Sequence, residues 1–158
     1  MNILNEACIS ISPDNNKIVS ASYDSIKIWN ASTGELINTL CHHIGTRWVC
    51  FSPDNDKIVS ANNDSIKICK AATGQLINSL YCHMGVVWIC FSPDNKKIAS
   101  VSHDSIKIWN TLTNQLINTL YGHIGAVWVC FSMDNKRIIS KSYDNAVKIW
   151  DVETGELI

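Results

Sequence analysis

One five-residue segment recurs at a fixed interval and constrains the fold more than any other feature of the sequence. It reads ISPDN at 11–15, FSPDN at 51–55 and 91–95, and FSMDN at 131–135, so consecutive copies start forty residues apart. Cutting the chain at this interval gives four similar units, which run over 1–40, 41–80, 81–120 and 121–158. Periods of this size are typical of repeat architectures. The units account for the whole sequence, which predicts a single domain over 1–158.

The third unit indicates what one repeat forms. Residues 87–91 alternate with a period of two and are apolar on both faces, as in a buried strand. Further strands are expected over 97–101, 105–110 and 115–120. The FSPDN segment is then a strand end followed by a hairpin turn, in which Pro fixes φ and Asn tolerates a left-handed conformation. No segment has helical periodicity, so each unit is predicted to be a four-stranded antiparallel sheet.

A sheet that is apolar on both faces cannot bury itself. It has to stack against another sheet, and in a repeat protein each unit supplies the face that its neighbour needs. The repetition therefore predicts a stack of similar sheets with a continuous apolar core.

Residues 122–151, GHIGAVWVCFSMDNKRIISKSYDNAVKIWD, resemble one unit of the WD-repeat (tryptophan-aspartate repeat) β-propeller family. The likeness consists of a Gly-His, a strand that ends in Phe-Ser-x-Asp, a Ser-x-Asp turn and a closing Trp-Asp, and related units cover essentially the whole chain. The resemblance implies an all-β fold, a β-propeller of four-stranded antiparallel blades with four blades per chain. Rings of seven or eight such blades are usual in the family, so one expected arrangement is half of an eight-bladed ring.

In that family a His, a Ser or Thr of the second strand, a turn Asp and the Trp form a buried hydrogen-bond network. The matching residues are His43, Ser60 and Asp64 in the second unit, His83, Ser100, Asp104 and Trp109 in the third, and His123, Ser140, Asp144 and Trp150 in the fourth. The second unit has Cys69 in place of the Trp, and the first has Ile3 in place of the His. A missing member can leave a buried partner unsatisfied, so blades one and two are expected to be less stable than the others.

The chain also departs from the family pattern at the first strand of each unit. VWICFS and VWVCFS are one residue shorter than the usual form, which is expected to remove the β-bulge that family blades carry there. The turn before the third strand is one residue shorter in units one to three than in unit four. Both changes lie at the rim where family members bind partners.

The loops of that rim differ from one unit to the next. The candidate partner-binding residues are Tyr23, Arg47, Asn63, His103 and Tyr143. Varied residues on a repeated scaffold favour a binding face. The alternative is drift at exposed positions, because the loops of the opposite rim vary as well.

Two other sets of residues recur. Trp48, Trp88 and Trp128 stand on the innermost strand, where packing between blades is favoured over an aromatic ring around a channel. Lys27, Lys67, Lys107 and Lys148 form a row on the third strand, which predicts a solvated edge with buried aliphatic stems.

Charge and cysteine content restrict the class of partner. Only 17% of the residues are charged, the formal net charge is −1, and there is no basic run, so neither nucleic acid nor a membrane is an expected partner. The seven cysteines are an odd number, the N-terminus has no apolar signal region, and Cys50, Cys90 and Cys130 stand within apolar strands. These features favour a reducing, intracellular and cytoplasmic location.

Two kinds of chemistry compete with a purely structural interpretation. His123, Ser140 and Asp144 could form a hydrolase triad, but the same set recurs in other units and no G-x-S-x-G motif is present. Cys41-His42-His43 and Cys82-His83 could bind a metal, but they do not form a spaced C-x-x-C pair. No glycine-rich phosphate loop occurs. We therefore expect no catalytic residue, no metal and no cofactor.

The leading hypothesis is a non-enzymatic scaffold that presents rim loops to a protein partner. The alternatives are the hydrolase and a self-assembling structural repeat protein without a dedicated ligand. Four blades at the family's curvature leave two open apolar faces, and large exposed apolar patches are rare on soluble monomers. A homodimer that closes an eight-bladed ring is expected, with a four-bladed monomer as the alternative.

Overall fold

The computed structural model describes residues 8–40, 44–81 and 85–158. These residues form fifteen β-strands and no helix. Among them there is accordingly no helix long and apolar enough to cross a bilayer. The chain divides into two compact units, Met1–Met84 and Gly85–Ile158, which are described separately.

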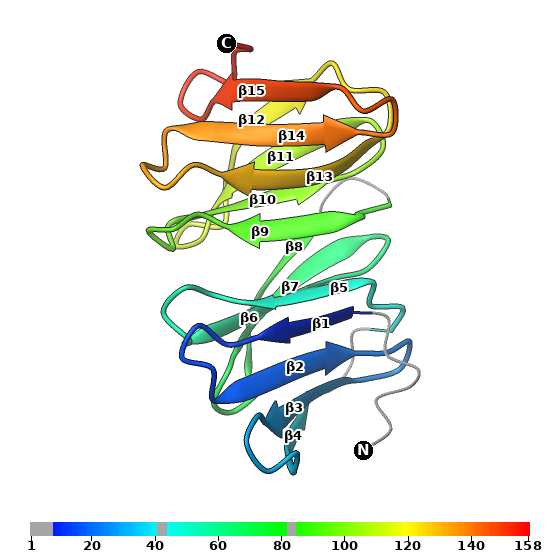
Figure 1. The fold of residues 1–158 in the computed structure, drawn as a ribbon, viewed down its shortest axis with the longest axis vertical. Helices are drawn as coiled ribbons and strands as arrows, with labels where there is room; N and C mark the ends of the chain where they lie inside the picture. The colour runs from blue at the N-terminus through cyan, green and yellow to red at the C-terminus, as the bar shows by residue number, and fades with distance from the viewer. Residues whose placement is uncertain (1–7, 41–43, 82–84) are drawn as a thin grey trace. The chain divides into compact units, whose positions relative to one another are not determined.

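Unit one contains two antiparallel four-stranded sheets, with the strands of each in sequence order. The sheet of blade one consists of β1 (Cys8–Ile11), β2 (Lys17–Ala21), β3 (Ile26–Asn30) and β4 (Leu36–Leu40). The sheet of blade two consists of β5 (Trp48–Phe51), β6 (Lys57–Ala61), β7 (Ser65–Lys70) and β8 (Leu76–Tyr81). The inner strands β1 and β5 pack against each other (Figure 1).

Unit two contains one four-stranded and one three-stranded sheet. Blade three consists of β9 (Trp88–Phe91), β10 (Lys97–Val101), β11 (Ser105–Asn110) and β12 (Leu116–Tyr121). Blade four consists of β13 (Ala126–Phe131), β14 (Arg137–Ser142) and β15 (Val147–Asp151), and its chain end adds an isolated bridge between Trp150 and Leu157. Strand β13 packs against both β9 and β10 (Figure 1).

Apolar side chains from facing sheets form one core in each unit. In unit one, Val19 and Ile28 of blade one pack with Val49 and Ile58 of blade two. In unit two the same repeat positions form a second core, whose members include Ala99, Ile108, Val129 and Ile138. Each strand contributes to the faces on both sides because alternate side chains point in opposite directions.

The irregular positions in the sheets differ from the expectation. We expected the short inner strand to lack a bulge, but in blade four the pairing of β13 with β14 shifts between Ala126 and Trp128. The inner pairs of blades one to three show no shift over their paired residues. In those blades the shift lies on the outer pair instead, between Ile28 and Trp29 in blade one and at the matching positions in blades two and three. Blade four, which has the longer turn between its second and third strands, also has the longest of the described inner strands, β13.

The recurring Ser-x-Asp-Asn segment forms the turn between the first and second strands of every blade. In blade one the Ser12 hydroxyl donates to Asp14 Oδ1 at 2.6 Å, and the backbone N–H of Asn15 donates to the Ser12 carbonyl at 2.8 Å. The Asn has a positive φ of 60–63° in all four copies. This conformation is tolerated by Asn better than by other residues with a Cβ atom, which explains why the segment is repeated.

Candidate functional site

A tryptophan–serine hydrogen bond links the third strand to the second in three of the four blades. The indole N–H donates to the serine hydroxyl oxygen from Trp29 to Ser20 at 2.8 Å, from Trp109 to Ser100 at 3.0 Å and from Trp150 to Ser140 at 2.7 Å. All three serines are fully buried. In blade two the sequence has Cys69 at the position of this tryptophan, although Ser60 is buried like the serines of the other blades.

Blade four adds a histidine to this bond. His123 Nε2 lies 2.7 Å from Ser140 Oγ, and the imidazole stands edge-on to the Trp150 ring at a centroid distance of 6.2 Å. The carboxylate of Asp144 accepts hydrogen bonds from the Ser142 hydroxyl and the Ala146 N–H. The structure therefore joins three of the four residues that the family pattern assigned to this blade, and Asp144 acts on His123 through its charge alone.

The remaining members of the expected network are placed as follows. His43 and His83 lie outside the described residues. Asp64 and Asp104 are exposed turn residues, and neither carboxylate hydrogen-bonds to another described residue. Of the expected networks of blades two and three, the structure therefore describes only the buried serines, Ser60 and Ser100, and the bond from Trp109 to Ser100.

Burial holds His123 in the neutral form. Desolvation is the main cause that lowers the pKa of this imidazole below its ordinary value, and the positive charge of Lys148 lowers it further. The negative charge of Asp144 and the contact with Ser140 oppose the shift without cancelling it. A neutral imidazole can form one hydrogen bond with Ser140 Oγ, and the Trp150 indole N–H donates to the same oxygen.

This lowered pKa predicts a loss of stability in mild acid. The unfolded chain binds a proton at His123 more readily than the folded chain does. The contribution of this residue to the free energy of unfolding is therefore fully present above the ordinary pKa of 6.5 and is lost as the pH falls below it. Urea unfolding of the wild type and of His123→Gln at pH 7, 6 and 5 measures the effect. We expect the variant to cost about 1 kcal/mol at pH 7, with a smaller difference at pH 5.

Other titrating groups do not disturb this comparison. Hydrogen bonds from Ser12, Ser132 and Ser142 are the main causes that lower the pKa values of Asp14, Asp134 and Asp144. These carboxylates therefore titrate below the tested range, and the remaining histidines cancel between wild type and variant. A difference that stays constant from pH 7 to pH 5 would contradict the assignment.

The expected row of lysines lies over the tryptophan rings. The ammonium groups of Lys27, Lys107 and Lys148 stand 5.9 Å from the ring centroids of Trp29, Trp109 and Trp150 respectively. These are cation–π distances, and they give the row a role beyond solvation. In blade two Cys69 replaces the tryptophan, and the positive charge of Lys67 acts on its thiol. In unit two, Trp88 and Trp128 lie 6.2 Å apart by ring centroids, as expected for packing between blades.

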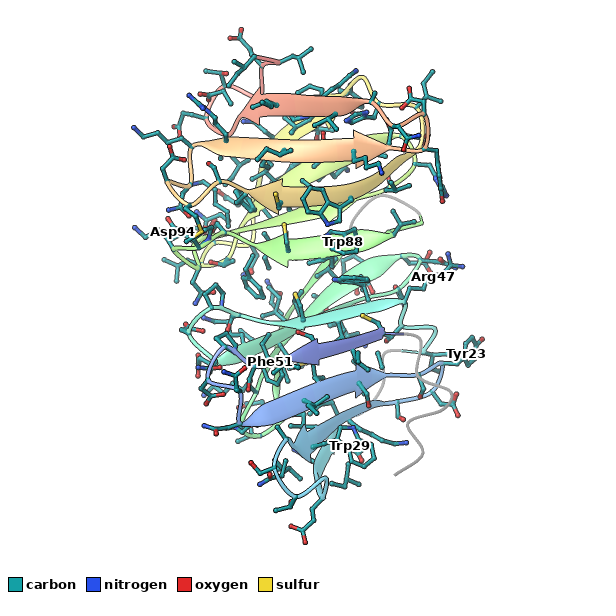
Figure 2. All side chains as sticks on the ribbon, viewed as in Figure 1. Tyr23, Trp29, Arg47, Phe51, Trp88 and Asp94 are labelled. Atoms are coloured by element: carbon teal, nitrogen blue, oxygen red, sulfur yellow. The ribbon has the colours of Figure 1, made fainter. Side chains whose placement is uncertain are left out.

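The candidate rim of unit one carries Tyr23, Arg47 and Asn63, all of which are exposed. Figure 2 shows Tyr23 and Arg47 projecting at the same edge of this unit. The Gly45 N–H donates to the Tyr23 carbonyl at 2.6 Å, and the Asn62 side chain donates to the Ile44 carbonyl at 3.2 Å. Loops of blades one and two therefore hold each other in place at this rim.

The rim of unit two brings two predicted residues into direct contact. His103 and Tyr143 stack with their ring centroids 6.2 Å apart and their planes 24° from parallel. Gly125 fixes both, because its N–H donates to the His103 carbonyl at 2.9 Å and its carbonyl accepts from the Tyr143 N–H at 3.0 Å. Both side chains remain exposed. The result is an aromatic pair that spans two blades on a rigid backbone frame.

A second hydrogen bond between neighbouring blades, not predicted from the sequence, lies at the opposite rim. The Asn55 side-chain carbonyl accepts from the Asp14 N–H at 3.4 Å, and the matching Asn135 accepts from the Asp94 N–H at 3.0 Å. The Ser-x-Asp-Asn turn therefore also connects its blade to the preceding one. The invariance of the Asn in all four turns was the available signal.

The structure offers no further chemistry among its described residues. No three His, Cys, Asp or Glu side chains within them gather to hold a metal ion, and Cys41, His42, His43, Cys82 and His83 lie outside them. Burial is the main cause that raises the pKa of the Cys90 thiol to about 12, and the nearby Cys130 raises it further. A thiol with such a pKa is a poor nucleophile.

The sequence matches a known family model four times. The model is that of the WD domain, G-beta repeat (WD40), and it matches residues 7–30, 34–69, 74–110 and 114–151. The match at 34–69 starts before β4 of blade one and ends within β7 of blade two, so one sequence repeat supplies the outer strand of one blade and the three inner strands of the next.

The sequence was also compared with curated proteins, and the structure with solved structures. None of the curated proteins matches. Among solved structures, the hydrazine synthase of Kuenenia stuttgartiensis is similar over the whole of this chain with a TM-score of 0.89 and 17% sequence identity. The chain spans 49% of the length of that protein. This likeness concerns the fold alone. The four repeat matches, which cover most of the sequence, show that the chain belongs to the WD40 repeat family.

Proposed function

We propose that this chain is a non-enzymatic protein–protein interaction module. It binds a protein partner through the rim that carries the loops between blades and the turns between the second and third strands of each blade. The observation that carries the proposal is the stack of His103 on Tyr143 in unit two. Exposed aromatic side chains that are already ordered lose little entropy on binding and are common anchors at interfaces. Tyr23 and Arg47 supply comparable groups on the rim of unit one.

The environment of Ser140 argues against the hydrolase alternative. Its hydroxyl is fully buried, accepts from Trp150 and contacts His123. Asp144 pairs with Ser142 and not with the imidazole that a triad would require it to orient. The same Trp–Ser bond recurs in blades one and three, as a structural role predicts.

The cysteines and the charge support the rest of the proposal. The five described cysteines form no disulfide, which is consistent with a reducing intracellular compartment. The net charge of −1 favours neither nucleic acid nor membrane as a partner.

A comparison of matched double variants tests the rim. His103→Ala/Tyr143→Ala removes the stacked pair, whereas Leu112→Ala/Met133→Ala removes two exposed apolar residues from the opposite rim. Proteins bound by the immobilised wild type in an extract of the source cells are identified and their recovery by each variant is quantified. We expect the first variant to recover at least about tenfold less partner, since hot-spot truncations cost about 2 kcal/mol or more. Circular dichroism checks that both variants are folded.

Two results would contradict the proposal. Equal recovery by both double variants would remove the rim of unit two from the interface. Greater loss with Leu112→Ala/Met133→Ala would place the partner on the opposite rim.

A further inference from the structure

The stacked pair of His103 and Tyr143 has an acidic residue beside each ring. Asp104 follows His103 in the sequence, Asp144 follows Tyr143, and both aspartates are exposed. Because consecutive Cα atoms are about 3.8 Å apart, each carboxylate belongs to the residue next to one ring of the pair. The rings themselves stack at a centroid distance of 6.2 Å. The rim of unit two therefore combines an aromatic surface with two acidic groups.

These two carboxylates keep acceptor capacity that the described part of the protein does not use. The Asp104 carboxylate makes no hydrogen bond or ion pair with another described residue. In Asp144, Oδ1 accepts from the Ser142 hydroxyl and the Ala146 N–H, whereas Oδ2 accepts from no described residue. The hydrogen bond from Ser142 is the main cause that lowers the pKa of Asp144, so this carboxylate is charged at neutral pH.

The lysines on the last two strands of these blades do not neutralise the two carboxylates. Lys107 and Lys148 lie over the tryptophan rings of their own strands. Lys141 of β14 is exposed and forms no ion pair with a described carboxylate. A cation from another molecule can therefore reach this rim without displacing an internal partner.

Unit one offers a comparison within the same chain. Its rim has two aspartates at the same repeat positions, Asp24 and Asp64, and an exposed aromatic ring, Tyr23. It also carries a guanidinium group, because Arg47 is exposed in the loop before β5, at the same edge as Tyr23 (Figure 2). The matching residue of blade four is Val127. Unit two thus has the acidic and aromatic groups of this rim without the arginine.

An exposed apolar side chain lies next to the stacked pair. Ile124, in the loop between β12 and β13, is 89% exposed and precedes Gly125. Gly125 hydrogen-bonds to the backbones of both ring residues, so the same frame that orders the rings also holds the backbone beside Ile124. An apolar group in this position can cover the methylene stem of a long charged side chain.

Arginine matches this combination of groups better than lysine does. Its planar guanidinium stacks on aromatic rings and carries a fork of N–H donors that suits carboxylates, whereas the lysine ammonium is a compact and strongly hydrated charge. Hydrogen bonds between a guanidinium and a carboxylate are charge-assisted and therefore stronger than neutral ones. The stem of arginine is also long enough to lie along an apolar neighbour while its charged end meets an acid.

We propose that the rim of unit two binds an arginine of the protein partner. The guanidinium stacks on Tyr143 and pairs with the flanking carboxylates of Asp104 and Asp144, and its stem covers Ile124. This inference rests on the proposed function and adds the chemistry of the partner residue to it. Because exposed charges are screened by salt, binding of the arginine should weaken as the ionic strength rises.

Nuclear magnetic resonance of the isotope-labelled full chain, titrated with the peptide acetyl-Gly-Ser-Arg-Ser-Gly-amide, measures this binding directly. We expect saturable shifts of the backbone amide signals of His103, Asp104, Gly125 and Tyr143. The same peptide with citrulline keeps the shape of arginine and lacks its charge. It should bind at least about fivefold more weakly, because the cation–π contact and the ion pairs are lost together. The lysine peptide should also bind more weakly than the arginine peptide.

Two double variants with the same change in net charge separate the rim from the charge of the whole protein. Asp104→Asn/Asp144→Asn removes the two acidic groups of this rim, and the amide oxygen at position 144 can still accept from Ser142. Asp94→Asn/Asp134→Asn removes two acidic groups from the opposite rim of the same unit. The first variant should raise the dissociation constant of the arginine peptide about three- to tenfold, and the second should leave it unchanged. Circular dichroism checks that both variants are folded.

Several outcomes would overturn the proposal: no shifts at the rim signals, equal binding of the citrulline or lysine peptide, or equal loss in the two double variants. An arginine peptide that binds His103→Ala/Tyr143→Ala as well as the wild type would also remove the stacked pair from the site. If the peptide fails to bind while His103→Ala/Tyr143→Ala still loses the protein partner, the rim stays the proposed binding surface and arginine is excluded as the residue it recognises. If the peptide binds as expected while partner recovery is unchanged, the arginine site is supported and the proposed interface is contradicted.

Discussion

Replacing Trp150 by Ala is expected to lower the free energy of unfolding by about 3–5 kcal/mol, the usual cost of removing a buried aromatic side chain. Trp150 is only 4% exposed, belongs to the core of unit two, donates to Ser140 and meets the edge of His123. The substitution opens a cavity in that core and removes the surface over which Lys148 lies. Urea unfolding followed by circular dichroism measures the loss.

Trp150→Phe is the matched control because it keeps an aromatic ring in the core while it removes the indole N–H and only part of the side-chain volume. Ser140 retains its contact with His123, so we expect a cost of about 1 kcal/mol. If the Phe variant is as unstable as the Ala variant, the hydrogen bond and not the packed volume dominates at this position.

Gly125→Ala is expected to destabilise the protein by about 2–5 kcal/mol and to weaken partner binding. Gly125 has a φ of +71°, where a side chain costs about 1–2 kcal/mol. A Cβ atom there would stand 2.8 Å from Cδ2 of Tyr143, and displacing that ring adds an overpacking cost of about 1–3 kcal/mol. The ring belongs to the proposed binding pair, so the same shift should reduce recovery of the partner.

Gly85 provides a control with the same backbone and a different environment. Its φ is +73°, and a Cβ atom there would meet no atom within 4 Å. Gly85→Ala should therefore carry the backbone cost alone and leave the partner bound. Thermal or urea unfolding of the two variants, with the recovery assay, separates the effects. Equal destabilisation by both substitutions would show that Tyr143 accommodates the methyl group.

The strands could be predicted closely because their signals are local. The expected strands at 97–101 and 105–110 agree with β10 and β11, since alternation and flanking turn residues fix both ends. The family pattern predicted the serines of the tryptophan bond. In the observed register Ser100 pairs with Lys107, two residues before Trp109.

The features that sequence reasoning missed depend on how blades meet. The Asn135 bond to Asp94 and the frame around Gly125 join residues of different repeats, and no pattern within one repeat reports them. Asp144 was assigned to His123 by family pattern, but the Ser142 hydroxyl, two residues away, is the nearer donor. The bulge near Ala126 depends on how β13 pairs with β14, which the alternation within one strand does not display.

Each of the last three sequence repeats begins at the fourth strand of one blade and ends at the third strand of the next. This shift between repeat and blade has a consequence for how the gene can change. The boundaries between family matches fall near 30–34, 69–74 and 110–114, in the turns between third and fourth strands. The outer strands that follow are nearly the same, LINTL, LINSL and LINTL at 36–40, 76–80 and 116–120. Unequal recombination between such copies would insert or delete forty residues, and the third strand at the crossover would still be followed by an equivalent outer strand. The array can therefore lengthen or shorten by whole blades in a single genetic event.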